Sequence, residues 1–490
     1  MALANVILYP SPGMGHLISM VELGKFIQNH HPKCSITILT HNPPFNTGST
    51  AAYISHVSTT VPSINFHSLP VISLPQDLDA YPSMETIIFE LILLSNPHVH
   101  RALTSISSTT TAPVVFVIDF FCTPALSIAK TLNIPTYYFF TSGAYALALF
   151  QYFPTLHKIT TENFKDTDEI IHIPILPPIP SPDMPDPLLD RTWMTYNFFL
   201  EIGNNFQKSQ GIIINTFDSL EEKAIRALSD GVFVPEPDKP APPVFCLGPL
   251  IASGGRGVGE AGGGGGRHEC LKWLDKQPGT GSVVFLCFGS LGLFSAEQLK
   301  EIAMGLERSE QRFLWVVRTP PSEDKSGRFL PPPEPDLDYL LPEGFLERTK
   351  DRGLVAKSWV PQVEVLNHEA VGGFVTHCGW NSVLEALWAG VPMVAWPLYA
   401  EQKINRVFLV EELKLAIGMN ETDKESGFVT ADVISETVKE LMRTESSSSL
   451  RERIQRKKEE ARRAMNDGDG GSSVLALSKL VESWKDSSED

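Results

Sequence analysis

The chain alternates short apolar runs with longer stretches in which apolar residues recur at helical spacing. Runs such as PVVFVID (113–119) are apolar up to their last residue, which is typical of strands covered on both faces of a parallel sheet. Because helical stretches separate these runs, the pattern predicts repeated strand–helix units of a doubly wound α/β fold. The predicted strands span 5–9, 35–39, 113–119 and 134–140 in the first half, and 282–288, 313–318, 372–377 and 391–396 in the second.

A proline-rich stretch (234–244) and a glycine-rich stretch (250–269) lie between the two sets of strands and have the composition of a linker and an exposed loop. A chain of 490 residues is long enough for two large domains. We therefore predict two Rossmann-like domains that face a cleft, an N-terminal one over 1–247 and a C-terminal one over 248–470. The remainder, 471–490, is predicted to form a helix and an acidic tail that pack back on the N-terminal domain.

Composition narrows the possible partners and the compartment. The chain has 40 Lys and Arg against 57 Asp and Glu, a net charge of −17, which disfavours binding to nucleic acid. Its six cysteines are scattered without a CxxC pair, which indicates reduced thiols rather than a disulfide framework or a zinc site. The N-terminus lacks a basic segment followed by a long apolar one, and the apolar stretch 137–153 is interrupted by polar residues. We expect a cytoplasmic protein without a signal peptide or a transmembrane segment.

The segment GGFVTHCGWNSVLEAL predicts a buried strand, a glycine-containing turn and a new helix. Asn381 or Ser382 is predicted to be the N-cap residue, with Glu385 one turn further on. Unpaired amides and the positive end of the helix dipole make such a helix N-terminus suitable for a diphosphate, and His377 adds a donor at the strand end. An ordinary strand–helix turn with a capped helix explains the same residues without any ligand.

The 44 residues from Trp359 to Gln402 resemble the signature segment of the plant family 1 UDP-glycosyltransferases, enzymes of the two-Rossmann-domain GT-B type. The match runs from the opening Trp to the closing Gln at the usual length. The other motifs follow in the family's order, so the resemblance extends over essentially the whole chain. It implies UDP-sugar as the donor substrate.

The resemblance also implies which residues contact the donor. Many family members have Asp where this chain has Glu401, which preserves an acceptor for sugar hydroxyls. The implied contacts are Trp359, Val360 and Gln362 at the uracil, Glu385 at the ribose hydroxyls, His377, Asn381, Ser382 and Ser290 at the diphosphate, and Trp380, Glu401 and Gln402 at the sugar.

Three residues of the N-terminal half complete the candidate site. His16 follows the glycine turn after the first predicted strand, and Asp119 ends the strand 113–119, so both stand at the carboxyl ends of strands. The segment lacks GxGxxG, which disfavours a dinucleotide dehydrogenase. By resemblance, His16 is the general base, Asp119 orients it, and Thr141 contacts the donor sugar. By themselves these residues are equally compatible with a structural His, a loop-capping carboxylate and a helix N-cap at Thr141 or Ser142.

We expect the protein to transfer glucose from UDP-glucose, with inversion, to a small hydrophobic, phenolic (flavonoid-like) acceptor. The sequence shows no aspartate pair at metal-binding spacing, so we expect neither a cofactor nor a metal, and we expect a monomer. In this family a closing Gln accompanies UDP-glucose and a closing His UDP-galactose, while Arg at the Trp380 position accompanies UDP-glucuronate. Carbon attack on the phenol ring, a catalytically silent UDP-sugar-binding protein, and a hydrolytic or epimerising enzyme are the alternatives.

Overall fold

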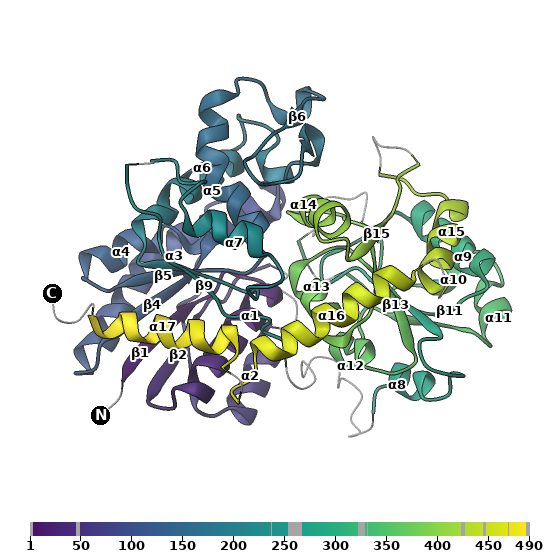
Figure 1. The fold of residues 1–490 in the computed structure, drawn as a ribbon, viewed down its shortest axis with the longest axis horizontal. Helices are drawn as coiled ribbons and strands as arrows, with labels where there is room; N and C mark the ends of the chain where they lie inside the picture. Colours follow the sequence, from purple (N-terminus) through teal and green to yellow (C-terminus); the bar gives the residue numbers. More distant parts are fainter. Residues whose placement is uncertain are drawn as a thin grey trace. The chain divides into compact units, whose positions relative to one another are not determined.

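The computed structural model describes residues 3–45, 50–236, 238–252, 267–321, 329–330, 332–422, 427–443, 447–468 and 470–486. These residues form two compact units, one within Met1–Ala252 and Glu460–Asp490, the other within Ser253–Glu459 (Figure 1). The sequence prediction placed the corresponding boundaries after 247 and after 470. Most of the predicted glycine-rich loop, 253–266, and the last residues of the acidic tail, 487–490, lie outside the described residues.

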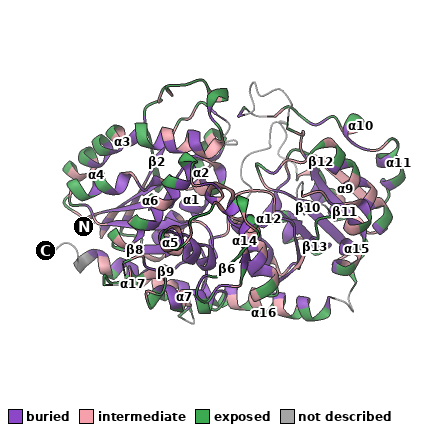
Figure 2. Ribbon diagram, turned by 90° about the horizontal axis from the view of Figure 1, so that it is seen from above, coloured by how far each residue is buried: buried purple, intermediate pink, exposed green. Residues whose placement is uncertain are grey.

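The first unit contains a seven-stranded parallel sheet in the order β3-β2-β1-β4-β5-β8-β9. Its central strands are mostly apolar, as expected of strands with helices on both faces of the sheet, and Figure 2 shows them buried. The chain proceeds outward from β1 through β2 and β3, then returns to β1's other side to form β4. The strands are β1 (Ala4–Tyr9), β2 (Cys34–Thr40), β3 (Ile64–Ser68), β4 (Val114–Asp119), β5 (Thr136–Phe140), β8 (Gly211–Ile214) and β9 (Val244–Cys246), and a separate two-stranded sheet pairs β6 (Ile170–Ile171) with β7 (Ile179–Pro180).

The second unit repeats this plan with a six-stranded parallel sheet in the order β12-β11-β10-β13-β14-β15. Again the chain proceeds outward on one side of its first strand, β10, and returns to the other side to form β13. The strands are β10 (Val283–Cys287), β11 (Arg312–Val317), β12 (Gly353–Lys357), β13 (Val371–Thr376), β14 (Met393–Ala395) and β15 (Ala416–Gly418).

Helices connect the strands in both units and expose their outer faces (Figure 2). In the first unit they are α1 (Met14–His30), α2 (Thr50–Thr60), α3 (Met84–Ser108), α4 (Ala125–Thr131), α5 (Ala144–Ile159), α6 (Met194–Asn205), α7 (Glu222–Ser229) and α17 (Ser472–Asp486). In the second they are α8 (Glu269–Leu274), α9 (Ala296–Ser309), α10 (Leu337–Leu340), α11 (Phe345–Thr349), α12 (Gln362–Leu366), α13 (Trp380–Ala389), α14 (Gln402–Val407) and α15 (Ala431–Met442), and α16 (Ser448–Ala464) runs from the second unit into the first.

The C-terminal helix α17 belongs to the first unit although it comes last in the chain. It packs against β9, and the hydroxyls of Tyr137 and Ser483 lie 2.9 Å apart. The hydroxyl of Ser473 donates to the carbonyl oxygen of Gly248 at 2.6 Å. The last helix therefore contributes to the core and the hydrogen bonds of the N-terminal sheet.

Two further observations concern the whole described chain. All six cysteines are free and buried. No helix among the described residues has the length and apolar character that crossing a membrane requires.

Candidate active site

The point where the first sheet reverses its strand order lies between β1 and β4. In open α/β sheets, ligands bind outside the carboxyl ends of the strands at such a point. α1 starts after the short turn that follows β1, with Gly13 as its N-cap residue and His16 in its first turn. Asp119 is the last residue of β4. Because β1 and β4 are paired, these two residues lie at the same edge of the sheet.

The side chains of His16 and Asp119 form a direct hydrogen bond, with His16 Nδ1 2.7 Å from Asp119 Oδ2. The carboxylate is fully buried, and its other oxygen, Oδ1, accepts a hydrogen bond from the Phe121 amide at 3.0 Å. A carboxylate can only accept, so Nδ1 carries the proton and Nε2 carries the lone pair. About a quarter of the His16 side chain, 24%, is exposed. The pair has the geometry of a general base held in one tautomer.

Aromatic rings extend from His16 into the first unit. The Phe121 ring lies 5.2 Å from the imidazole, and it contacts Phe89 of α3 and Phe199 of α6 at 5.5 and 5.7 Å between ring centroids. Phe150 of α5 stacks on Phe199 at 5.1 Å. This aromatic cluster (Phe89, Phe121, Phe150 and Phe199) makes the surroundings of His16 on this side apolar. This cluster was not predicted from the sequence, although the Phe120-Phe121 pair directly after Asp119 was a visible signal.

Thr141 lies in the turn between β5 and α5, and its hydroxyl oxygen is 3.4 Å from His16 Nδ1. The alternative explanation of Thr141 or Ser142 as the N-cap of α5 does not hold, because Gly143 is the N-cap residue. The buried carboxylate of Glu221 accepts from the Tyr145 amide at 3.0 Å and from the Thr216 hydroxyl at 2.6 Å. A carboxylate from the loop after β8 therefore satisfies the amides that a local cap would otherwise bind.

The second unit reverses its strand order between β10 and β13. The turn after β10 contains Gly289 and the exposed Ser290, and His377 directly follows β13. A Cβ atom on Gly289 or on Gly379 would lie 2.5 Å from His377 Nε2, so the imidazole approaches both backbones more closely than any side chain would permit. The two glycines allow His377 to lie between the two turns at this edge of the sheet.

His377 is a neutral donor at this edge. Its imidazole is buried, and burial lowers its pKa to about 4. Nδ1 has no hydrogen-bond partner among the described residues. A buried N–H without a partner is rarer in native structures than an unpaired acceptor. The proton therefore belongs on Nε2, which faces the glycine turns.

Helix α13 begins two or three residues earlier than predicted. Gly379 is the N-cap residue and has no side chain to cap with, so the prediction of Asn381 or Ser382 as N-cap is wrong. Trp380, Asn381 and Ser382 instead occupy the first turn. Without a side-chain cap, the amides of that turn and the helix dipole favour an anion.

Gln362, Ser382 and Glu385 form one buried hydrogen-bonded group. The Gln362 side-chain nitrogen Nε2 donates to Ser382 Oγ at 2.9 Å and to Glu385 Oε2 at 2.6 Å. All three side chains are buried, and they come from α12 and α13. Glu385 Oε2 is therefore already held by an amide donor, which fixes the direction in which the carboxylate accepts.

The remaining predicted donor contacts lie in the same unit. Trp359 lies two residues after the end of β12. Its ring makes an edge contact with the His268 ring at 5.8 Å, and the next residue, Val360, is buried. Glu401 and Gln402 begin α14. Gln402 Oε1 accepts from the amides of Leu398 and Tyr399 at 2.9 and 3.0 Å, so its NH₂ group supplies the remaining donors.

The structure thus brings the predicted residues together in two groups, one in each unit. His16, Asp119 and Thr141 form the first group. The second consists of the residues predicted to contact the donor, at the carboxyl edge of the second sheet. Among the residues that the structure describes, no three His, Cys, Asp or Glu side chains are grouped so that they could hold a metal ion.

Two Rossmann-like units, each built on a parallel sheet, are the architecture of the GT-B class of glycosyltransferases. Residues 267–448 match the family model described as "UDP-glucoronosyl and UDP-glucosyl transferase". Over 481 residues the chain is 52% identical to UDP-glycosyltransferase 88B1 of Stevia rebaudiana, covering 98% of this chain and 99% of that protein. The chain belongs to the family 1 plant UDP-glycosyltransferases.

The names of two further relatives state a substrate or a bound ligand. Anthocyanidin 5,3-O-glucosyltransferase of a Rosa hybrid cultivar is 49% identical over 493 residues, with 98% of both chains covered. The structure of Phytolacca americana UGT2 complexed with UDP-2fluoro-glucose and pterostilbene matches with a TM-score of 0.83 at 36% identity, covering 98% of this chain and 100% of that one. These likenesses agree with the enzyme class that the resemblance implied: this protein is a UDP-sugar-dependent glycosyltransferase.

Proposed function

We propose that this protein transfers glucose from UDP-glucose to a hydroxyl group of a small phenolic, flavonoid-like acceptor, with inversion at the anomeric carbon. The hydrogen bond between His16 and Asp119 is the observation that carries the proposal, because a protein that only binds UDP-sugar has no need for an oriented base. The aromatic cluster beside His16 supports a flat, apolar acceptor. The names of the rose and Phytolacca relatives support glucose as the sugar and polycyclic phenols as acceptors.

In the proposed reaction, His16 Nε2 takes the proton of the acceptor hydroxyl while its oxygen attacks the anomeric carbon. The new carbon–oxygen bond forms as the bond from that carbon to the diphosphate oxygen breaks, and the electron pair leaves with UDP. A phenol with a pKa near 10 would cost about 4 kcal/mol to ionise first at pH 7. A positioned base avoids much of this cost. Asp119 stabilises the imidazolium that forms.

The second unit would bind the donor in this proposal. The amides at the start of α13, the neutral His377 Nε2–H and Ser290 would receive the negative charge that develops on the departing diphosphate. Gln362 and Glu385 would bind the ribose side of the nucleotide, and Trp359 would stack on the uracil. Trp380, Glu401 and Gln402 would line the sugar.

One assay tests the proposal against its alternatives. The protein is incubated with UDP-glucose alone and then with a flavonoid, and released UDP and glucosylated product are measured. The proposal expects UDP release only with acceptor, together with an acid-labile O-glucoside. UDP release without acceptor would indicate hydrolysis, an acid-stable product would indicate carbon attack, and binding without turnover would indicate a silent protein.

We also propose that the enzyme needs no metal ion and acts as a monomer in the cytoplasm. Turnover should persist in excess EDTA, and size-exclusion chromatography with light scattering should give the mass of one chain. A tagged protein should fractionate with cytoplasmic markers. Loss of activity in EDTA that Mg²⁺ restores would contradict the metal-independent part.

A further inference from the structure

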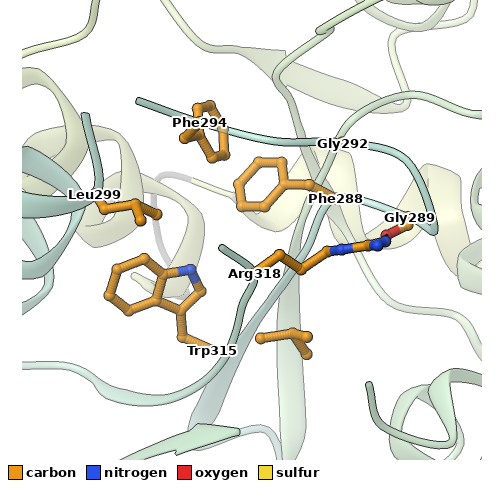
Figure 3. A pocket seen from close by; sticks show the side chains of 8 residues that line it. Phe288, Gly289, Gly292, Phe294, Leu299, Trp315 and Arg318 are labelled. Atoms are coloured by element: carbon orange, nitrogen blue, oxygen red, sulfur yellow. The ribbon is translucent and has the colours of Figure 1, made fainter. Parts of the chain in front are cut away.

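Arg318 directly follows β11, next to the turn that carries Gly289 and Ser290. Its guanidinium nitrogen Nη1 donates to the carbonyl oxygen of Gly289 at 3.3 Å and also to the carbonyl oxygen of Ser290. Figure 3 shows the side chain extending toward Gly289, with its nitrogens beside that residue. One arginine therefore binds two successive carbonyls of this turn.

The surroundings of Arg318 hold the side chain in one place. It lines a small pocket together with Phe288, Phe294, Leu299 and Trp315 (Figure 3). Phe288, Leu299 and Trp315 are buried and Phe294 is partly exposed, and the pocket of about 10 Å³ has room for roughly one water molecule. Burial lowers the pKa of the guanidinium from its ordinary value. A guanidinium remains charged in proteins even so, which means that a cation is retained beside the turn.

The two hydrogen bonds determine the direction of the neighbouring amides. In a trans peptide the C=O and N–H groups point to opposite sides, and both peptide bonds of this turn are trans. Because the carbonyls of Gly289 and Ser290 point toward Arg318, the amides of Ser290 and Leu291 point away from it. Successive amides on one side of a turn form a concave site for an anion. His377 Nε2, which lies against Gly289, is a further donor next to the same turn.

We propose that Arg318 is a positioning residue of the donor diphosphate site, holding the Gly289–Ser290 turn so that its amides face the diphosphate. This inference rests on the proposed binding of UDP-sugar by the second unit. Arg318 does not itself touch the ligand. It acts through the turn, and its positive charge adds to the attraction for the anion. The residues predicted from the sequence did not include it.

The test compares binding of UDP with binding of uridine, which lacks the phosphates, by isothermal titration calorimetry. Arg318→Met should weaken UDP binding by roughly ten- to a hundred-fold, because the turn loses the charged hydrogen bonds that hold its amides toward the diphosphate. The variant should leave uridine binding unchanged. Arg318→Lys, which keeps one charged donor, should lie between the wild type and Arg318→Met. Arg308→Met is the matched control, since Arg308 is an exposed arginine of the same unit, paired with Asp432. It should change neither affinity.

Each outcome decides the inference. Equal losses for UDP and uridine, or no loss for UDP, would overturn it and leave the proposed function standing. A wild-type protein that binds neither UDP nor UDP-glucose would overturn the proposed function instead. If Arg318→Met does not fold, hydrogen exchange on the wild type replaces it: UDP but not uridine should protect the amides of Ser290 and Leu291, and absence of that protection overturns the inference.

Discussion

His16 Nδ1 lies 2.7 Å from Asp119 Oδ2, although 103 positions separate the two residues in the chain. Pairing of β1 with β4 brings them to one edge of the sheet. The pairing also assigns different tasks to the two ring nitrogens, one bound to the carboxylate and the other available for a substrate proton. The first two predictions follow from this assignment.

Replacing His16 with Ala should lower kcat by about 10²- to 10⁴-fold, the usual contribution of a general base. The affinity for UDP should hardly change, since UDP is proposed to bind in the second unit. His30→Ala, at the other end of α1 and paired with Asp467, is the matched control and should retain full turnover. Retention of most turnover by His16→Ala with a phenolic acceptor would show that another group is the base.

Asp119→Asn should be nearly as damaging as loss of the imidazole. The Phe121 amide binds Oδ1, so the new amide nitrogen would take the place of Oδ2 and donate to His16 Nδ1. The proton would then move to Nε2, which is the wrong tautomer for a base. Phenols of lower pKa need the base less, so kcat/KM across a series of substituted phenols should depend more steeply on phenol pKa in the variant. Parallel slopes for the two proteins would contradict the tautomer argument.

His377 should make the second unit less stable in acid. Its pKa is about 4 in the folded protein and about 6.5 in an unfolded chain. Between these values the unfolded state binds more protons, so stability is full above pH 6.5 and falls as the pH drops toward 4, by at most about 3 kcal/mol. Six of the eight tryptophans lie in the second unit, so fluorescence follows its unfolding.

Unfolding by urea at pH 4.5 and 7.5 checks this for the wild type and for His377→Gln. The difference between the two pH values should be smaller in the variant, which has no titrating group at this position. An unchanged difference would mean that other groups cause the acid sensitivity.

Glu221→Ala should destabilise the first unit by about 1–3 kcal/mol, because the Tyr145 amide and the Thr216 hydroxyl would lose their buried partner. Burial raises the pKa of the Glu221 carboxyl, but its hydrogen bonds need the acceptor oxygens. The neighbouring Glu222 is exposed and paired with Arg226, so Glu222→Ala should cost at most about 0.5 kcal/mol. Denaturant unfolding measures the free energy of unfolding of both variants. Equal losses of stability would show that Glu221 does not cap α5.

UDP-glucose should be preferred over UDP-galactose and, by a wider margin, over UDP-glucuronate. The Gln402 amide is fixed by the amides of Leu398 and Tyr399, so its NH₂ group can favour one arrangement of sugar hydroxyls. Glu401 beside it would repel a sugar carboxylate. Measurement of kcat/KM for the three donors with one acceptor checks the order. A kcat/KM with UDP-glucuronate equal to that with UDP-glucose would show that Trp380 and Glu401 do not line the sugar site.

Much of the fold was predictable because its central strands are runs of mostly apolar residues. The eight predicted strands correspond to β1, β2, β4, β5, β10, β11, β13 and β14. The strands that were missed are short or lie at the edges of the sheets. β12 has five residues and is only partly buried, and β9 and β15 have three residues each. Such strands have too little burial or length to leave a periodic signal.

Local chemistry alone misplaced the starts of two helices. Ser, Thr and Asn are good N-caps in general, yet Gly143 and Gly379 occupy the N-cap positions of α5 and α13. For α5 the reason is a long-range contact, since Glu221 from the loop after β8 binds the helix amides. A cap supplied from another element leaves no trace in the residues around the helix start.

By itself the sequence determined the family, the alternation of strands and helices, and the residue types at the strand ends. Only the tertiary structure decided that Asp119 holds His16, that Gln362 holds Glu385, and that Arg318 binds the turn at Ser290. It also decided that phenylalanines of α3, α5 and α6 pack with Phe121, whose ring lies beside the imidazole. Periodicity records how each segment meets the core, whereas these contacts depend on which strands become neighbours, and that is settled only when the whole sheet has formed.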